Sequence, residues 1–147
     1  MKTVIFLCHG NICRSSAAEF VFKYLVTQEG RENEFHIYSR GVSNEEYGND
    51  IYPPMKRALQ RAGIPYERHF AQRITPEEYA EADYIFYMDR SNLDLALWRI
   101  PDTKHIYKPI FEFTPSVHEV ADPWYDGRHE EALSQIIKCC KDILKHI

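Results

Sequence analysis

Residues 8–15 read CHGNICRS, and their types and spacing could bind an anion. A loop that runs from the end of a strand to the start of a helix can turn successive backbone N–H groups inward, and the helix dipole adds to the same positive potential. Gly10 and Asn11 are residue types that tolerate the positive φ angles of a tight loop. Arg14 can donate two parallel hydrogen bonds to a phosphate. The sequence therefore predicts a binding site for a dianion.

Cys8 stands at the base of this predicted loop, where its thiol could act as a nucleophile. A thiol in a positive field loses its proton more readily, so we expect Cys8 to be largely thiolate near neutral pH. Ser15 could donate a hydrogen bond to that thiolate, which could attack a bound phosphate in line and form a phosphocysteine. A plainer interpretation of the same residues is a buried thiol at a strand end and a solvated Arg14 at a helix start.

The elements on either side of the loop place it between a strand and a helix. The apolar run at residues 2–7 predicts a buried strand. The helix that follows has its apolar side chains spaced three and four residues apart. Ser16 and Glu19 predict a capping box at its start, and Gly30 predicts its end.

Strands and helices then alternate along the rest of the chain. Further strands are predicted at residues 36–40, 84–88 and 105–108, and further helices begin near Pro53, Thr75, Asp89 and Gly127. This alternation predicts a single-domain, three-layer α/β fold with a four-stranded parallel sheet flanked by helices. Ligands of such sheets bind beyond the carboxyl ends of the strands, where we expect both residues 8–15 and residues 109–127.

Composition narrows the class of protein. The 147 residues are 44% hydrophobic and 27% charged, which is ordinary for a globular domain. A net charge of -4 argues against nucleic-acid binding, and no apolar stretch has the roughly 20 residues needed to cross a membrane. The short N-terminal apolar run does not form a signal-peptide core, so we expect a cytoplasmic location.

The four cysteines are expected to be free thiols in that compartment. Cys140 falls on the apolar stripe of the last predicted helix and is interpreted as core, with Cys139 as its flanking neighbour. A zinc site at Cys8, His9 and Cys13 is disfavoured, since no second pair of ligands accompanies them. We therefore expect no metal and no cofactor.

The string from Cys8 to Ser15 is similar to a known signature. Cys8, five intervening residues, Arg14 and Ser15 form the C-x5-R-S pattern of cysteine-dependent phosphatases, and the fuller string resembles that of low-molecular-weight protein tyrosine phosphatases of the bacterial type. The resemblance extends along nearly the whole chain, through GI at 63–64, ITPEEY at 74–79, MDRSNL at 88–93 and DPWYDG at 122–127. It implies a flavodoxin-like (phosphotyrosine phosphatase I-like) fold.

The activity implied by the resemblance is metal-independent hydrolysis of a phosphotyrosine protein or a small aryl phosphate, with inorganic phosphate as product. We expect the protein to be a monomer or a weak dimer. A phenol has a pKa of about 10, so a general acid must protonate the leaving oxygen. The resemblance assigns that role to Asp122, and Pro123 independently restricts Asp122 to an extended or turn conformation. The substrate- and phosphate-binding residues are then His9, Gly10, Asn11, Ile12, Cys13, Arg14, Ser15, Trp124 and Tyr125.

Supporting roles come from the same resemblance. His69 would hydrogen bond Asn11 and hold its strained conformation, although a packing histidine fits the sequence as well. Asp89 resembles an aspartate near the base of the site, although helix capping explains it equally. Trp124 and Tyr125 could flank a phosphotyrosine ring or simply pack at a loop hinge.

Three positions raise separate questions. His9 occupies a position that is often apolar in the family, and we expect it to change the rim of the pocket. Glu45 and Glu46 lie where some relatives have an aromatic wall, and these acids should disfavour acidic peptides. Cys13 corresponds to a loop cysteine that can form a protective disulfide with the nucleophile, although it could also simply fill space.

Three other functions have features in common with this sequence. A protein arginine phosphatase has a similar loop but carries threonine at the position of Ile12, whose bulk favours phosphotyrosine. A thioredoxin-coupled arsenate reductase needs further cysteines after the third strand, and residues 76–104 contain none. A non-enzymatic phosphopeptide-binding module requires Cys8 to remain protonated.

Overall fold

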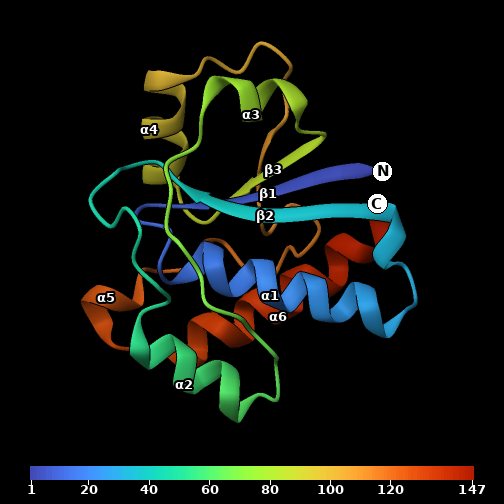
Figure 1. Ribbon diagram of the computed structural model, residues 1–147, viewed down its shortest axis with the longest axis vertical. Coiled ribbons are helices and arrows are strands. Elements are labelled where there is room, and N and C mark those ends of the chain that lie inside the picture. The colour runs from blue at the N-terminus through green and yellow to red at the C-terminus, as the bar shows by residue number, and fades with distance from the viewer.

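The computed structural model describes residues 1–147 and is built on a four-stranded parallel sheet in the order β2-β1-β3-β4 (Figure 1). The strands are β1 (Lys2–Cys8), β2 (Phe35–Gly41), β3 (Tyr84–Tyr87) and β4 (Tyr107–Pro109). The helices are α1 (Arg14–Gln28), α2 (Pro53–Arg61), α3 (Pro76–Glu81), α4 (Arg90–Arg99), α5 (Pro123–Asp126) and α6 (His129–His146), with a short 3-10 helix at Glu32–Glu34. The predicted three-layer α/β architecture is confirmed.

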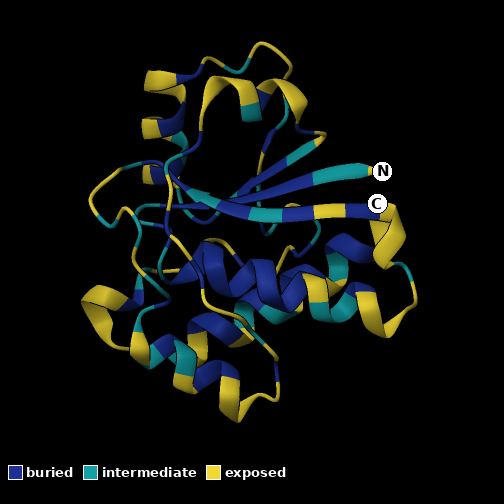
Figure 2. Cartoon of the chain, in the orientation of Figure 1, coloured by how far each residue is buried: buried dark blue, intermediate teal, exposed yellow.

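Helices cover both faces of the sheet, with α1, α2 and α6 on one side and α3 and α4 on the other (Figure 1). Because β1 is central and covered on both faces, its residues 4–8 form a continuous apolar run. Alternate side chains serve different cores: Val4 and Phe6 belong to the large cluster with α1 and α6, whereas Ile5 and Leu7 belong to the smaller cluster with α3 and α4. Figure 2 shows the resulting buried centre and the exposed outer faces of the helices.

The two ends of the sheet differ. Both chain termini lie at one end, and α5 lies at the opposite end, toward which the strand arrows point (Figure 1). β1 is followed by a connection to β2 on one side, while β3 lies on its other side, so the strand order reverses at this position. In parallel α/β sheets such a reversal opens a ligand-binding crevice at the carboxyl ends of the strands.

The capping predictions had different outcomes. Thr75 and Asp89 each form a capping box at the start of α3 and α4, as the sequence predicts. The capping box predicted at Ser16 and Glu19 is wrong: the N-cap of α1 lies three residues earlier, at Cys13, and makes no side-chain capping hydrogen bond. The hydroxyl of Ser16 instead donates to the carbonyl oxygen of Cys13 at 3.1 Å.

Two other local predictions, the bounds of β4 and the position of Cys139, need correction. β4 spans Tyr107–Pro109 rather than residues 105–108, because His105 has a φ of 57° that no extended strand accommodates. Asp122 has the extended conformation that Pro123 predicts, and the four residues after it form the short helix α5. Cys139 is as completely buried as Cys140, because α1 and the segment before α5 cover α6 from two directions.

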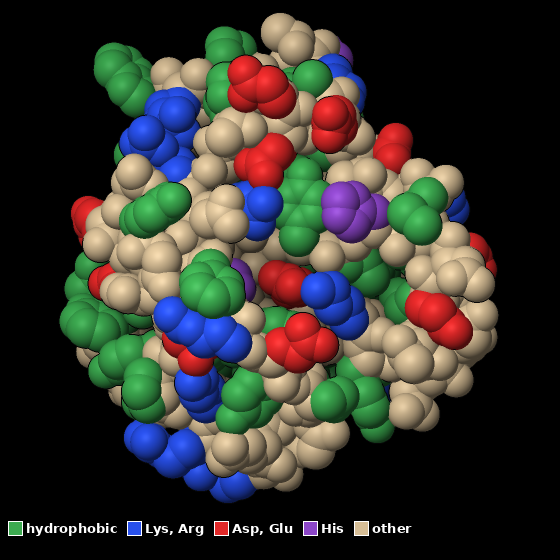
Figure 3. Space-filling view, in the orientation of Figure 1, with side chains coloured by type: hydrophobic (Ala, Val, Ile, Leu, Met, Phe, Trp, Pro, Cys, Tyr) green, Lys and Arg blue, Asp and Glu red, His purple; other side chains and the backbone are tan.

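None of the helices has both the length and the apolar composition that crossing a membrane requires. On the face in Figure 3, acidic and basic side chains are interspersed, with no broad region of one sign. This mixed distribution agrees with the small net charge of -4.

Gly41, at the carboxyl end of β2, lies against the loop that leaves β1. Its N–H donates to the carbonyl oxygen of Gln72 at 2.7 Å, and the next residue, Val42, donates to the carbonyl oxygens of Cys8 and His9 at 3.0 and 3.1 Å. A β-carbon at position 41 would lie 2.9 Å from the carbonyl oxygen of His9, closer than van der Waals contact permits. The close approach of β2 to the loop therefore requires glycine.

We expect Gly41→Ala to lower the free energy of unfolding by about 1–3 kcal/mol, because the added methyl group forces backbone apart in a packed region. Urea denaturation of the two proteins measures this loss. Gly63→Asn is the matched control, since Gly63 has φ 73° and open space around it, and asparagine tolerates that conformation. Equal losses in the two variants would contradict the steric explanation.

Candidate active site

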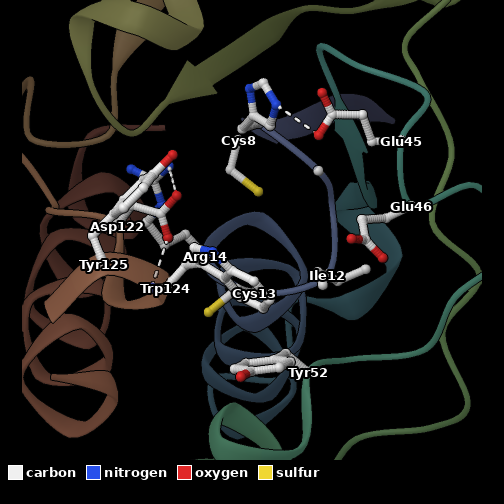
Figure 4. A pocket seen from close by; sticks show the side chains of 12 residues that line it. Cys8, Ile12, Cys13, Arg14, Glu45, Glu46, Tyr52, Asp122, Trp124 and Tyr125 are labelled. Atoms are coloured by element: carbon white, nitrogen blue, oxygen red, sulfur yellow. Dashed lines mark hydrogen bonds and ion pairs between the residues drawn. The ribbon is translucent and has the colours of Figure 1, made fainter. Parts of the chain in front are cut away.

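A cavity of about 200 Å³ lies at the carboxyl end of β1 (Figure 4). Its lining combines the loop after β1, the segment before α2, and the start of α5. The lining residues are Cys8, His9, Gly10, Ile12, Cys13, Arg14, Glu45, Glu46, Tyr52, Asp122, Trp124 and Tyr125. The structure thus brings together residues 8–14 and residues 122–125, which are separated by more than a hundred positions in the chain.

The backbone N–H groups of residues 9–16 donate no hydrogen bond to any acceptor of the protein. Carbonyl groups of the same loop are paired: that of Ile12 accepts from the N–H of Tyr52 at 2.7 Å, and that of His9 accepts from Val42 and Ser43. Unpaired N–H groups are uncommon away from solvent, and a run of them beside a helix start is suited to binding an anion.

Asn11 has the left-handed conformation in this loop, with φ 66°. The expectation that Gly10 also has a positive φ is wrong, since Gly10 is not among the residues with positive φ. Glycine at position 10 instead makes room for the neighbouring chain, because a β-carbon there would lie 3.2 Å from Cγ of Glu46. The strain of the loop is therefore concentrated at Asn11.

Asn11 is fully buried. Each of its polar groups except the backbone N–H makes a hydrogen bond within the protein. Its carbonyl oxygen accepts from Nε2 of His69 at 2.6 Å, and its Oδ1 accepts from the N–H of Gln72 at 3.1 Å. Its Nδ2 donates to the hydroxyls of Ser15 and Ser39 at 2.9 and 3.0 Å. The backbone N–H of Gln72 can only donate, so the atom of Asn11 that it faces must be Oδ1. This determines the orientation of the Asn11 side-chain amide.

The Cys8 sulfur lies 3.0 Å from the hydroxyl oxygen of Ser15. Since that oxygen already accepts from Nδ2 of Asn11, its proton is free to point at the sulfur. Ser15 is therefore oriented to donate to Cys8, and a hydrogen bond to the charged form of a group favours that form.

The other branch of this network ends in a carboxylate. Ser39 accepts from Asn11 and donates to Oε1 of Glu19 at 2.7 Å, while Lys23 donates to Oε2 of Glu19 at 2.6 Å. Glu19 therefore pairs with Ser39 of β2 instead of forming the cap of α1 that the sequence predicts. No local pattern signals this pairing, because Ser39 lies in β2 and Glu19 in α1.

Arg14 is 2% exposed and contacts three groups at the base of the cavity. Its Nη1 donates to Oδ2 of Asp89 at 2.7 Å and to the carbonyl oxygen of Val120 at 2.8 Å, and its Nη2 lies 3.5 Å from Oδ2 of Asp122. Burial lowers the pKa of Arg14, but the charges of Cys8, Asp89 and Asp122 raise it above its ordinary value. Arg14 therefore remains a cation, with Nη2 free of a close hydrogen bond.

Asp89 carries out both tasks that the sequence offered as alternatives. Its Oδ1 accepts from the N–H of Asn92 and caps α4, while its Oδ2 accepts from Arg14. Helix α4 therefore fixes the orientation of the guanidinium.

Asp122 stands at the start of α5 on the opposite side of the cavity from Glu46 (Figure 4). Its Oδ1 accepts from the N–H of Trp124 at 3.0 Å, which leaves Oδ2 toward Arg14. The ring centroids of the exposed Trp124 and of Tyr52 are 5.1 Å apart, and Tyr125 is also exposed at the mouth of the cavity. Aromatic side chains thus form one wall of the cavity.

Tyr52 lines the active-site cavity, although the sequence did not predict it as a site residue. The available signal was its place directly before the two prolines that open α2. Because Tyr52 is far from residues 8–15 in the chain, the sequence did not indicate that it lines the same cavity.

Cys13, at the base of the cavity, and the pair of His9 and Glu45, at its rim, complete the lining. Burial, and then the charges of Cys8 and Asp122, raise the pKa of the Cys13 thiol well above its usual range, so Cys13 stays protonated. All four cysteines are free thiols. At the rim, Nε2 of the half-exposed His9 lies 3.3 Å from Oε2 of Glu45. The chain has no group of three His, Cys, Asp or Glu side chains arranged to hold a metal ion.

His69 generates a prediction about pH. Burial lowers the pKa of His69, so the folded protein holds it neutral with Nε2 donating to Asn11. In the unfolded chain His69 binds a proton below about pH 6.5, and there the unfolded state has more protons than the folded state. The contribution of His69 to stability is therefore complete above that pH and declines as the pH falls toward the lowered pKa.

We expect the free energy of unfolding of the wild type to fall more steeply between pH 7.5 and 5.5 than that of His69→Gln, which keeps a donor but cannot titrate. Urea denaturation at several pH values measures both slopes. Parallel slopes would show that His69 has no depressed pKa.

Comparison with known proteins places this geometry in a family. The sequence model described as low molecular weight phosphotyrosine protein phosphatase matches residues 3–147. The rat protein with that name is 37% identical over 98% of this chain and 94% of its own length. The low molecular weight protein-tyrosine-phosphatase YfkJ of Bacillus subtilis is 30% identical over the whole chain and 96% of its own length.

Solved structures agree with the sequence matches. The crystal structure of YfkJ has a TM-score of 0.95 and covers the whole of this chain and 94% of its own. The YwlE arginine phosphatase shares the fold, with a TM-score of 0.86 at 23% identity over 98% of this chain and 94% of its own. The family match covers both segments that line the cavity, the loop after β1 and α5. The chain belongs to the low molecular weight phosphotyrosine protein phosphatase family.

Proposed function

We propose that this protein hydrolyses phosphotyrosine monoesters through a phosphocysteine intermediate on Cys8. The observation that carries the proposal is the position of the Cys8 sulfur, 3.0 Å from the Ser15 hydroxyl, in one cavity with Arg14 and Asp122. The names of the relatives support phosphotyrosine as the substrate class.

In the first step the phosphate dianion binds the unpaired N–H groups of the loop and Nη2 of Arg14. The Cys8 thiolate attacks phosphorus, a sulfur–phosphorus bond forms, and the bond from phosphorus to the phenolic oxygen breaks. Asp122 transfers its proton to that oxygen, so the product leaves as neutral tyrosine. Arg14 and the N–H groups supply the positive charge that stabilises the equatorial oxygens.

In the second step the ionised Asp122 takes a proton from a water molecule. The water oxygen attacks phosphorus, the sulfur–phosphorus bond breaks, and inorganic phosphate forms. The departing sulfur carries a negative charge, which the Ser15 hydroxyl stabilises. The proton taken from water returns Asp122 to its protonated form, Cys8 is again a thiolate, and inorganic phosphate leaves.

The shape of the cavity favours an aryl ester. Ile12 is an apolar part of the lining, and the rings of Tyr52 and Trp124 can pack against a planar phenyl group. The carboxylates of Glu45 and Glu46 favour a cationic group near the mouth and therefore support phosphoarginine as a second candidate. Phosphotyrosine and phosphoarginine peptides of otherwise identical sequence distinguish the two substrates.

We expect Cys8→Ser to reduce kcat on phosphotyrosine peptides by about three orders of magnitude or more, because the nucleophile is lost. The variant should still bind inorganic phosphate, which isothermal titration calorimetry can measure. Rapid acid quenching of the wild type followed by mass spectrometry should find a phosphorylated Cys8 and no phosphate on Cys13, Cys139 or Cys140. Full turnover by Cys8→Ser without added metal would contradict the mechanism.

Asp122→Asn should lower kcat by about 10²–10⁴-fold on phosphotyrosine but far less on an aryl phosphate whose leaving group needs no proton. Steady-state kinetics with both substrates provides the comparison. Asp126→Asn is the matched control, because Asp126 lies in the same helix and accepts only from the N–H of Arg128. An equal loss on both substrates would exclude Asp122 as the general acid.

A further inference from the structure

A second cavity lies beside the active site, and nothing in the proposed chemistry uses it. We propose that this basic cavity, defined by Arg57, Arg61 and Arg128, binds the carboxylate of an acidic residue that flanks the phosphotyrosine of the substrate. The inference rests on the proposed phosphatase function and adds a substrate preference to it.

The basic cavity has a volume of about 460 Å³ and lies between α2, the connection from α5 to α6, and the first turn of α6. Pro54 and Arg57 come from α2, and Gly127 and Arg128 come from the connection. Figure 1 shows these elements together at the end of the molecule where the strands end. The helix that carries Trp124 thus leads directly into the basic cavity.

The lining of the basic cavity has three arginines and two glutamates, Glu130 and Glu131, so one guanidinium is left without a carboxylate. Arg57 is exposed and makes no salt bridge and no side-chain hydrogen bond within the protein. Arg128 lies 3.5 Å from Glu131, and Arg61 pairs with Glu130; all four of these side chains are more than half exposed. Exposed ion pairs contribute little to stability, so these arginines can exchange partners at small cost. A free, planar guanidinium such as that of Arg57 is suited to a carboxylate.

Two aromatic rings separate the basic cavity from the active-site cavity. Tyr52 lines the active-site cavity, His129 lines the basic cavity, and their ring centroids are 5.6 Å apart. The Nδ1 of His129 donates to the carbonyl oxygen of Gly127 at 3.3 Å, which orients its ring. An extended peptide advances about 3.3 Å per residue, so a residue about three positions from the phosphotyrosine can cross this wall.

The opposite rim carries the opposite charge. Glu45 and Glu46 lie across the active-site cavity from Trp124 (Figure 4), and no lysine or arginine lies within 4 Å of either carboxylate. Glu45 and Glu46 therefore repel an acidic residue on one side of the bound phosphotyrosine, and the basic cavity attracts one on the other side. In the peptide sequence, an acidic residue should be favoured either before or after the phosphotyrosine, but not in both places.

Four phosphotyrosine peptides test the proposal, with Asp or Asn at the third position before or after the phosphotyrosine. At low salt we expect one Asp peptide to exceed its Asn counterpart in kcat/KM by about threefold to tenfold, as expected for two or three exposed charge contacts. Arg57→Gln combined with Arg128→Gln should abolish this preference, and Arg57→Glu should reverse it. Lys138→Gln combined with Lys145→Gln, far along α6, is the matched control for net charge and should preserve it.

The proposal is overturned if neither Asp peptide is preferred, or if the preference survives both substitutions of Arg57. Turnover of a small aryl phosphate by the wild type, and its loss in Cys8→Ser, reports separately on the phosphatase chemistry. Hydrolysis of the aryl phosphate without any preference for Asp would reject the basic cavity alone. Absence of aryl phosphate hydrolysis would reject the proposed function itself.

Discussion

The unpaired backbone N–H groups of residues 9–16 are the constraint on which the rest of the structure depends. They explain why α1 has no side-chain cap, whereas α3 and α4, which need no anion at their starts, have complete capping boxes. A capping hydroxyl on α1 would accept from these N–H groups and leave fewer of them for the phosphate in the proposed reaction. Other contacts must therefore stabilise the loop, and they use its carbonyl groups and the side chain of Asn11.

Arg14 connects the loop to the segment that carries Asp122. Its buried guanidinium contacts Asp89 on one side and the carbonyl oxygen of Val120 on another, so the orientation of Arg14 and the path of the chain before Asp122 are determined together. A buried cation needs such partners, since its removal from water is costly. The distance of 3.5 Å to Asp122 is longer than these hydrogen bonds, so Asp122 is the Arg14 partner that the proposed binding of phosphate would displace at least cost.

Much of the fold could be predicted from the sequence because its signals are local. The apolar run of β1, the prolines of α2 and the caps Thr75 and Asp89 each act within a few residues. The candidate site residues at 8–15 formed a contiguous pattern, and Asp122 was found through resemblance. Tyr52 and the pairing of Glu19 with Ser39 could not be predicted, because their partners are adjacent only after the sheet forms.

The direction of every hydrogen bond around Asn11 follows from two groups that can only donate or only accept. The N–H of Gln72 must donate to Oδ1, so Nδ2 of Asn11 must donate to both Ser15 and Ser39. The ionised Glu19 must accept, and it takes the hydroxyl proton of Ser39. The hydroxyl proton of Ser15 then has Cys8 as its one remaining acceptor. A buried network that is otherwise satisfied thus directs a proton donor at the sulfur, which favours an anion there over a neutral thiol.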